Sequence, residues 1–253
     1  MQDSPYEQPW AKPELKDCVF YHAMSLPGAG ALAGQWDIRP DFDNYTGRLD
    51  VRGKRLLDVG TCTGQIAFEM EARGAEVTAF DADSVARFQW VPFAGRLEHR
   101  DRAAWNARNE AGLTGYKNAF WFAWHERRSA VRVAYGDLAR LSQTLPEQDI
   151  VLACAIIEHL SDPVTAIGQM ARLARETLVI GFTPIDPAEA PLMRPMQPWH
   201  PDHPYVWWRL SLGLYRSLLG QLGFEVTVIE AMALFHGEPA HRQTLVARRI
   251  RPA

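Results

Sequence analysis

The sequence predicts an α/β protein in which helices cover both faces of a mostly parallel sheet. From Lys54 onward, short apolar runs alternate with helical patterns, as in strand–helix–strand units. Two of these runs, Arg55–Val59 and Asp149–Cys154, are continuously rather than alternately apolar. Strands buried on both faces have this pattern, because helices cover both sides of a parallel sheet. The alternation and these two buried runs together predict the fold class.

Seven apolar runs are expected to form strands. They are Arg55–Val59, Glu76–Phe80, Val131–Tyr135, Asp149–Cys154, Thr177–Phe182, Glu225–Glu230 and Thr244–Arg249. A helix after the first run is expected to end at Gly74, because glycine favours the position that follows a helix. A second helix is expected to begin at Asp162-Pro163, a capping side chain followed by proline. A third is expected over about Leu210 to Leu222, before Gly223.

Three segments depart from this alternation. Residues 1–53 are rich in Pro, Gly and Asp, and we expect an N-terminal leader or cap before a single domain over residues 54–253. Residues 184–208 are dense in Pro, Met, His and Trp and predict a long loop that serves as a lid, because such loops inside compact domains are usually functional. Residues 87–128 have helical texture only around 101–111.

Composition narrows the class of protein. A chain of 253 residues with 47% hydrophobic and 23% charged residues has the composition of a globular protein. Its formal charge of −3 disfavours a nucleic-acid surface, which usually carries a basic excess. The three cysteines are widely spaced, no signal-peptide core is present, and no stretch approaches the roughly 18 apolar residues of a membrane span. We therefore expect a cytoplasmic protein, of undetermined oligomeric state.

The segment from Asp58 to Gln65 combines a strand end, a glycine turn and a helix start. Such a turn lets a ligand approach the backbone, and the helix N-terminus favours an anion. The dinucleotide fingerprint requires glycines at its first, third and sixth positions. Only Gly60 satisfies it here, because Cys62 and Gln65 occupy the other two positions. The turn therefore disfavours a dinucleotide, and a plain tight turn is the structural alternative.

Other candidate residues follow the next strands. Asp81 comes about twenty residues after the turn, where a carboxylate can accept hydrogen bonds from both ribose hydroxyls. Asp137 follows the third run, where it can meet an adenine amine, and Ala153 ends the fourth. Ligands of open α/β sheets bind at this edge. A helix cap for Asp81 and a turn role for Asp137 are the structural alternatives.

Together these motifs resemble the class I S-adenosylmethionine-dependent methyltransferases over about Lys54 to Ile250. The glycine turn, the acid after the second strand and His159-Leu-Ser-Asp-Pro163 carry the resemblance. It implies a Rossmann-like seven-stranded sheet with an antiparallel last strand, and S-adenosylmethionine as cofactor. It also implies that the cofactor is held at Asp58, Gly60, Thr61, Gly64, Asp81, Asp137 and Ala153.

A narrower likeness involves Phe20-Tyr21-His22, Gly34–Pro40 and Glu69–Val77. These segments look like a bacterial branch of small methyltransferases, related to enzymes that modify the wobble uridine of transfer RNA and including natural-product tailoring members. The common central glycine of the family's turn is Cys62 here. Three functions stay open: methylation of a small-molecule acceptor, which the charge favours, methylation of RNA, and non-catalytic binding of an adenosyl ligand.

Two histidines are candidate catalytic residues, because a histidine of near-neutral pKa can take a proton from an oxygen or nitrogen nucleophile. His159 follows the fourth run, and His22 joins it if the leader folds over the site. A loop histidine and a packed core residue are the respective alternatives. Trp36 and Trp207 are expected to approach the same cavity.

A metal site is not expected. His200 and His203 lie close together in the predicted lid, but two histidines with one acid between them are too few ligands.

Overall fold

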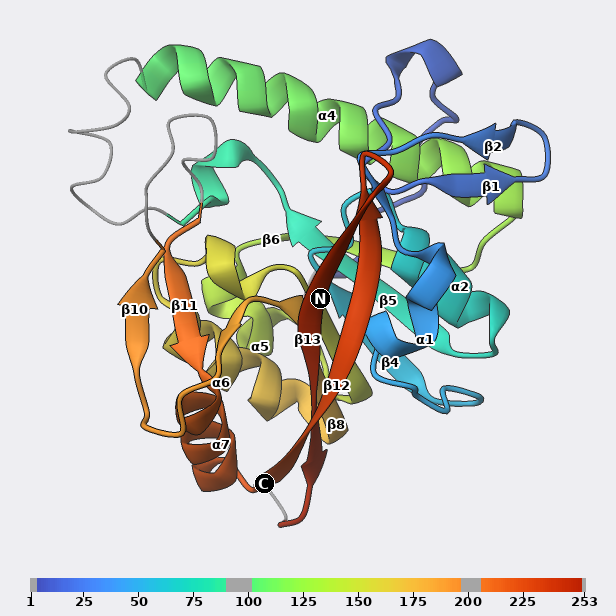
Figure 1. Cartoon of the computed structure of the whole chain (residues 1–253). Coiled ribbons are helices and arrows are strands. Elements are labelled where there is room, and N and C mark those ends of the chain that lie inside the picture. The colour runs from blue at the N-terminus through green and yellow to red at the C-terminus, as the bar shows by residue number, and fades with distance from the viewer. Residues whose placement is uncertain (1–3, 90–101, 197–205, 252–253) are drawn as a thin grey trace.

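The computed structural model describes residues 4–89, 102–196 and 206–251 (Figure 1). Its centre is an eight-stranded sheet in the order β3-β12-β13-β8-β7-β4-β5-β6. The strands are β3 (Trp36–Asp37), β4 (Arg55–Val59), β5 (Glu76–Ala82), β6 (Arg132–Gly136), β7 (Gln148–Cys154), β8 (Ala174–Thr183), β12 (Phe224–Phe235) and β13 (Glu238–Arg249). All seven predicted strands are therefore present.

The sheet is parallel from β6 through β8 and antiparallel beyond it. Strands β6, β5, β4, β7 and β8 pair in parallel, whereas β13 pairs antiparallel with β8, and β12 antiparallel with β13. The predicted Rossmann-like, mostly parallel sheet is confirmed. The count is eight because Trp36 and Asp37 of the leader pair with Phe235 and Leu234 of β12.

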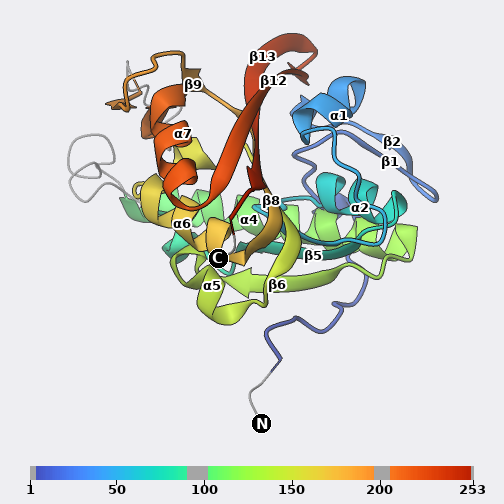
Figure 2. The ribbon, with the colours of Figure 1, turned by 90° about the horizontal axis from the view of Figure 1, so that it is seen from below.

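Helices cover both faces of this sheet (Figure 2). They are α1 (Phe42–Tyr45), α2 (Gln65–Ala72), α4 (Arg102–Arg127), α5 (Leu141–Thr144), α6 (Pro163–Leu173) and α7 (Leu212–Gln221). Successive strand residues point to opposite faces, so Leu56 packs with α2 and α4, whereas Leu57 packs with α5, α6 and α7. Two hydrophobic cores result, one on each face.

The predicted helix boundaries follow from local capping. Helix α2 ends at Ala72, and Gly74 beyond it has a φ of 95°. Helix α6 begins at Pro163, and the Asp162 side chain accepts a hydrogen bond from the backbone N–H of Thr165 at 3.1 Å. Helix α7 lies within the predicted range and is followed by Gly223.

Helix α4 is much longer than the helical texture at residues 101–111 predicts. Its 26 residues cross the top of the molecule in Figure 1. The buried side chains of Phe120 and Trp121 anchor its second half. The packing of such side chains of α4 against the sheet and the leader, rather than a regular apolar stripe, accounts for the length of the helix.

Five short 3-10 helices and two small sheets complete the described chain. The 3-10 helices are η1 (Leu15–Asp17), η2 (Arg39–Asp41), η3 (Val85–Arg87), η4 (Leu138–Arg140) and η5 (Ile157–His159). One small sheet pairs β1 (Met24–Leu26) with β2 (Gly30–Leu32), and the other joins β10 (Met193–Pro195), β11 (Trp208–Ser211) and β9 (Ile185–Asp186).

The leader touches both edges of the main sheet. At one edge, the Glu7 N–H donates to the Val133 carbonyl of β6 at 2.8 Å. Nearby, the Trp10 ring stacks on Trp121 of α4 with 5.8 Å between ring centroids. At the opposite edge lies β3, which contains Trp36. Segments at both edges of the sheet thus belong to the first 53 residues.

The described part of residues 184–208 is mostly the loop that its composition predicts, but it also contains short strands. It forms β9 and β10, and Trp208 begins β11. The Ser211 hydroxyl organises this small sheet, because it accepts from the Leu192 N–H at 2.8 Å and donates to the Ala190 carbonyl at 2.7 Å. His200 and His203 lie outside the described residues.

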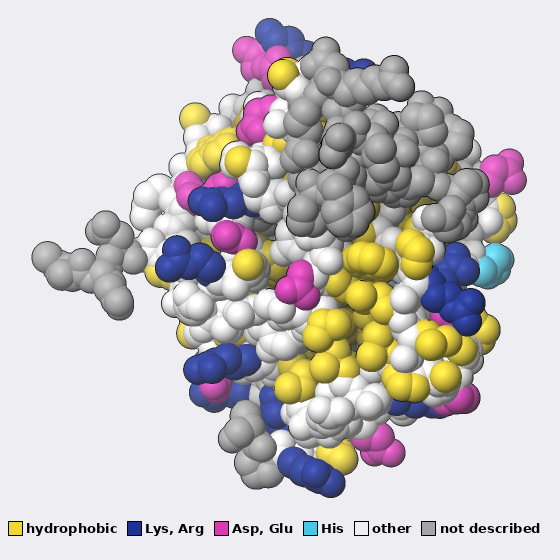
Figure 3. Space-filling view, turned by 90° about the vertical axis from the view of Figure 1, so that its left-hand side faces the viewer, with side chains coloured by type: hydrophobic (Ala, Val, Ile, Leu, Met, Phe, Trp, Pro, Cys, Tyr) yellow, Lys and Arg dark blue, Asp and Glu magenta, His cyan; other side chains and the backbone are white. Residues whose placement is uncertain are grey.

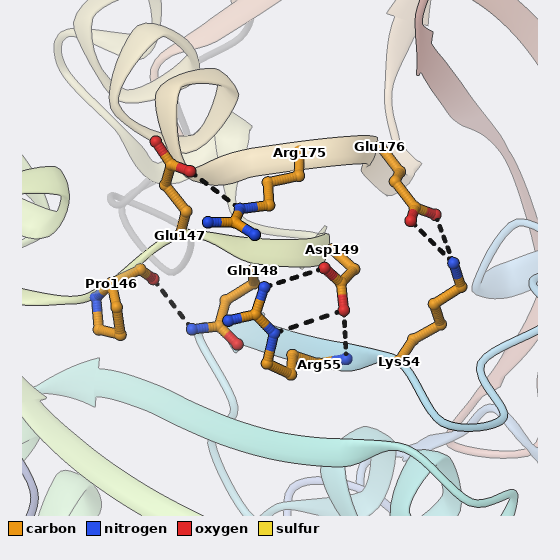
Figure 4. A network of polar contacts seen from close by, with 8 residues as sticks. All are labelled: Lys54, Arg55, Pro146, Glu147, Gln148, Asp149, Arg175 and Glu176. Atoms are coloured by element: carbon orange, nitrogen blue, oxygen red, sulfur yellow. Dashed lines mark hydrogen bonds and ion pairs between the residues drawn. The ribbon is translucent and has the colours of Figure 1, made fainter.

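Ion pairs join the amino-terminal ends of the parallel strands (Figure 4). Arg55 of β4 pairs with Asp149 of β7 at 3.0 Å, and Lys54 pairs with Glu176 of β8 at 2.8 Å. Exposed ion pairs contribute little to stability, because water and salt screen them. These pairs therefore help fix strand register at this edge but supply little of the stability.

Apolar side chains are exposed on the face that carries β10, β11 and α7 (Figure 3). Met193 of β10 and Leu222, next to α7, are among the exposed large apolar residues. No helix within the described ranges is both long and apolar enough to cross a membrane.

Candidate functional site

A cavity of about 220 Å³ lies at the carboxyl ends of β4, β5, β6 and β7. Each strand contributes to its wall at or just past its last residue: Gly60 after β4, Asp81 near the end of β5, Gly136 at the end of β6 and Cys154 at the end of β7. Ligands of open α/β sheets bind at this edge. The remaining wall comes from the leader, α4, η3 and η5.

The glycine turn after β4 presents its backbone to the cavity. The N–H groups of Gly60 and Thr61 both donate to the Phe80 carbonyl, at 2.8 and 3.1 Å. Gly60 has a φ of 78°, and a Cβ there would lie 2.8 Å from Cδ1 of Ile156. Cys62 also adopts a left-handed φ, of 52°. A non-glycine residue therefore takes the conformation that glycine would favour at the centre of the turn.

Asp81 links this turn to the end of β5. One carboxylate oxygen accepts from the Cys62 N–H and the other from the Ala82 N–H, both at 2.7 Å. Burial raises the pKa of Asp81, and the two N–H donors oppose that rise. Each oxygen of an ionised carboxylate can accept about two hydrogen bonds. Asp81 therefore keeps acceptor capacity for hydroxyl groups of a ligand in the cavity.

Asp58 and Thr61 lie beneath the turn rather than in the cavity wall. Asp58 is 1% exposed, and its Oδ2 has no hydrogen-bond partner within the described chain. Burial raises the pKa of Asp58 to about 7, and hydrogen bonds from Thr61 and from the Ala67 backbone oppose that rise. Asp58 and Thr61 therefore support the turn from inside the protein.

Gly64 shapes the turn through packing. It is the N-cap residue of α2 with a φ of 83°. A Cβ there would lie 2.5 Å from Phe68 and 2.7 Å from Phe120, both in the core. The structure thus places Gly64 against aromatic rings and not in the cavity wall.

Asp137 and Ala153 also lie next to the cavity rather than in its wall. The Asp137 side chain caps η4 by accepting from the Ala139 N–H at 2.9 Å, and it lies 3.8 Å from the Arg87 guanidinium. Ala153 is fully buried in the core shared with α6. Gly136 and Leu138, on either side of Asp137, and Cys154, which follows Ala153, line the wall instead. For Ala153 the reason is that successive residues of β7 point to opposite faces of the sheet.

His22 and His159 meet at this cavity, although one comes from the leader and the other from η5. His22 is 6% exposed, and its Nδ1 has no hydrogen-bond partner in the described part of the chain. Burial lowers the pKa of His22 to about 4, so its imidazole is neutral at physiological pH. The structure therefore brings both candidate catalytic side chains to one site.

Trp36 and Trp207 lie outside the cavity wall. The Trp36 ring packs on Phe182 and Phe235, with centroid distances of 5.6 and 4.7 Å. The Trp207 N–H donates to the Glu158 carbonyl at 2.7 Å, and its indole N–H donates to the Gln89 carbonyl at 3.0 Å. Both tryptophans therefore pack behind the site and do not line it.

Tyr45 and Tyr116 line the cavity with Tyr21, and neither was predicted from the sequence. The ring centroids of Tyr21 and Tyr116 are 5.8 Å apart, and those of Tyr21 and His22 are 4.9 Å apart. Tyr45 belongs to the short helix α1 and Tyr116 to the middle of α4. No motif surrounds either residue, so only the fold could reveal them.

A buried ion pair holds η5 against β13. Glu158, 3% exposed, lies 2.7 Å from Arg242, whose guanidinium is 5.1 Å from the centroid of the Phe182 ring. Glu158 immediately precedes His159, so the pair fixes the segment that brings His159 to the cavity. Among the described residues, no group of three His, Cys, Asp or Glu side chains is placed to hold a metal ion.

Residues 39–229 match the methyltransferase domain family, and the chain belongs to that family. No curated protein matches the chain.

Solved structures with a similar arrangement include magnesium protoporphyrin IX methyltransferase from Synechocystis PCC 6803 with bound S-adenosylhomocysteine. It is 16% identical, with 79% of this chain and 76% of that chain covered and a TM-score of 0.48. The Burkholderia thailandensis 1,6-didemethyltoxoflavin-N1-methyltransferase is 17% identical, with 79% and 72% covered and a TM-score of 0.47. A putative RNA methyltransferase from Pyrococcus horikoshii is 12% identical, with 81% and 78% covered and a TM-score of 0.42.

Proposed function

We propose that this protein transfers a methyl group from S-adenosylmethionine to a small-molecule acceptor. The observation that carries the proposal is the open glycine turn at the cavity wall, with the Asp81 carboxylate bound to its backbone. Membership of the methyltransferase domain family supports methyl transfer as the reaction. When bound, the cofactor supplies a methyl group that its sulfonium already activates.

The cofactor would lie along the strand ends. Asp81 would accept hydrogen bonds from the ribose hydroxyls, and the backbone around Gly60 would adjoin the methionine part. In this proposal the other residues act from just outside the wall. Asp58, Thr61 and Gly64 support the turn from below, and Asp137 and Ala153 hold the ends of β6 and β7.

The two histidines have different proposed roles. His159 is the candidate general base for a nucleophile that must lose a proton. His22, with its pKa lowered to about 4 by burial, is a weak base and is better suited to hold the acceptor by a hydrogen bond. The rest of the wall excludes water and aligns the nucleophile.

We also propose that the acceptor is a small molecule and that the protein is located in the cytoplasm. A cavity of about 220 Å³, lined in part by the leader, α4 and η5, favours a small acceptor over a polymer, and the net charge of −3 does not favour RNA. All three cysteines are free thiols, which suits the reducing cytoplasm.

The test is calorimetric titration of the purified protein with S-adenosylmethionine, S-adenosylhomocysteine and NAD. We expect binding of the first two and far weaker binding of NAD, because the turn lacks two glycines of the dinucleotide fingerprint. Tight NAD binding without S-adenosylmethionine binding would refute the cofactor assignment. Binding of transfer RNA that falls steeply with salt would favour the RNA alternative, and cofactor binding without methyl transfer to any acceptor would favour a non-catalytic role.

A further inference from the structure

Four segments of the chain contribute to the part of the cavity wall that the cofactor assignment leaves over. The leader supplies Tyr21 and His22, α1 supplies Tyr45, and α4 supplies Tyr116. Ile156 and His159 complete it after β7. We refer to these six residues as the acceptor wall.

The three tyrosines of the acceptor wall and His22 are uncharged at neutral pH. Burial raises the pKa of all three tyrosines, and burial lowers that of His22 to about 4, so these side chains are uncharged.

The charged residues among those that line the whole cavity in the described chain are Asp81 and Arg87. The Arg87 guanidinium already lies 3.1 Å from Asp83 and 3.8 Å from Asp137. A charged acceptor would therefore lose its hydration without gaining a free counter-ion, which is unfavourable in a buried site.

The acceptor wall is also aromatic. The Tyr21 ring meets both His22 and Tyr116 edge-on, at interplanar angles of 80° and 71°. The Tyr45 ring is itself held in a stack with Phe182, at a centroid distance of 4.7 Å. Rings arranged at these angles present faces and edges on which a further flat ring can pack, because aromatic pairs prefer offset or edge-to-face contact.

One buried polar atom in the acceptor wall has no partner in the described chain. His22 is 6% exposed, and its Nδ1 makes no hydrogen bond there, although its backbone N–H lies 3.4 Å from the Thr63 hydroxyl. Buried nitrogens of this kind are usually paired, so the orphan atom indicates a polar group supplied by a ligand or by a water that a ligand replaces.

We propose that the acceptor is an uncharged, planar aromatic compound with a hydroxyl group, whose ring packs on the tyrosines and whose hydroxyl is recognised by His22. This inference rests on the proposed function, because it takes the strand-end part of the cavity as the cofactor site. It specifies what the aromatic acceptor wall recognises.

Four probes of similar size separate these features. They are 2-naphthol, naphthalene, 2-naphthoate and decahydro-2-naphthol, titrated calorimetrically into the full-length protein saturated with S-adenosylhomocysteine. We expect 2-naphthol to bind at least about tenfold more tightly than 2-naphthoate, which must bury a charge, and more tightly than the non-planar decahydro-2-naphthol. Naphthalene should bind about fivefold more weakly than 2-naphthol, the scale of one neutral hydrogen bond.

The variant His22→Phe should bind 2-naphthol and naphthalene equally while still binding S-adenosylhomocysteine. A thermal melt of the variant shows whether it is folded. If the variant does not fold, the probe series on the unmodified protein still tests the proposal. Tighter binding of 2-naphthoate or decahydro-2-naphthol, or binding of none of the four, would overturn the acceptor class. Failure of the protein to bind S-adenosylhomocysteine at the start would instead refute the proposed function, so the two failures are distinguishable.

Discussion

Replacement of Gly64 by alanine tests how the glycine turn is built into the core. Gly64 has a φ of 83°, and a Cβ there would lie 2.5 Å from Phe68 and 2.7 Å from Phe120. A left-handed backbone costs an L-residue about 1–2 kcal/mol. Overpacking of a filled core costs about 1–3 kcal/mol more. Gly64→Ala should therefore lower the free energy of unfolding by about 2–5 kcal/mol.

Gly53 provides the matched control for this measurement. Its φ of 72° is similar, but a Cβ there would have no atom within 4 Å. Gly53→Ala should therefore cost only the backbone part, about 1–2 kcal/mol. Urea denaturation followed by tryptophan fluorescence and circular dichroism measures both variants. Equal losses for the two variants would show that the aromatic contacts do not restrict Gly64, and the packing argument would be wrong.

Three further perturbations test the site and its surroundings. Asp81→Ala should weaken S-adenosylhomocysteine binding in calorimetry by about 1.5–3 kcal/mol, the scale of hydrogen bonds to a charged group. The control variant Glu225→Ala changes an exposed acid of β12 that does not line the cavity, and it should bind like the parent. Equal affinities for the two variants would place the cofactor elsewhere. The pKa of His22 is about 4 in the folded state, below the unfolded value of about 6.5. Between these two pH values the unfolded state binds more protons than the folded state. His22 therefore makes the free energy of unfolding rise with pH across this range, by up to about 3 kcal/mol. His22→Gln should remove this part of the pH dependence in denaturation series between pH 4 and 7, whereas the control His241→Gln, at an exposed histidine, should retain it. Parallel curves for the parent and both variants would contradict burial of a neutral imidazole. Arg249→Met should lower the free energy of unfolding by about 1.5–3 kcal/mol, because the Arg249 guanidinium donates to the carbonyls of Ala171 and Ala174 at 2.7 and 2.8 Å. The control is Arg248→Met, at the exposed neighbouring arginine. Equal stabilities of the two variants would rule out this anchoring role of Arg249.

The sequence by itself was sufficient for the elements that local patterns encode. β4 has the predicted bounds Arg55–Val59, and the glycine turn follows it as expected. The start of α6 at Pro163 was equally predictable. Buried parallel strands, left-handed glycines and capping side chains leave signals within a few residues, because each satisfies a local backbone requirement.

Family resemblance extended this local information to the edge of the sheet where the site lies. It indicated Gly60, Asp81 and His159, which all line the cavity in the structure, and the chemistry of histidine added His22, which lines it too. It also indicated Asp137 and Ala153, whose side chains lie just outside the wall. A shift of one residue along a strand moves a side chain to the other face, so motif position alone cannot decide which side chain faces a ligand.

Other features were decided only by the tertiary structure. Trp36 and Asp37 join the main sheet as β3, and Tyr45 and Tyr116 enter the cavity wall from α1 and α4. Arg249 belongs to a basic tail in sequence, yet its side chain binds the carbonyls at the end of α6. Each of these contacts joins residues far apart in the chain, and their geometry depends on how helices and strands pack rather than on any local pattern. The acceptor wall is such a contact set. The order of residues along the chain therefore indicated a methyltransferase, whereas the packing of distant aromatic side chains determined the surface that we propose for the acceptor.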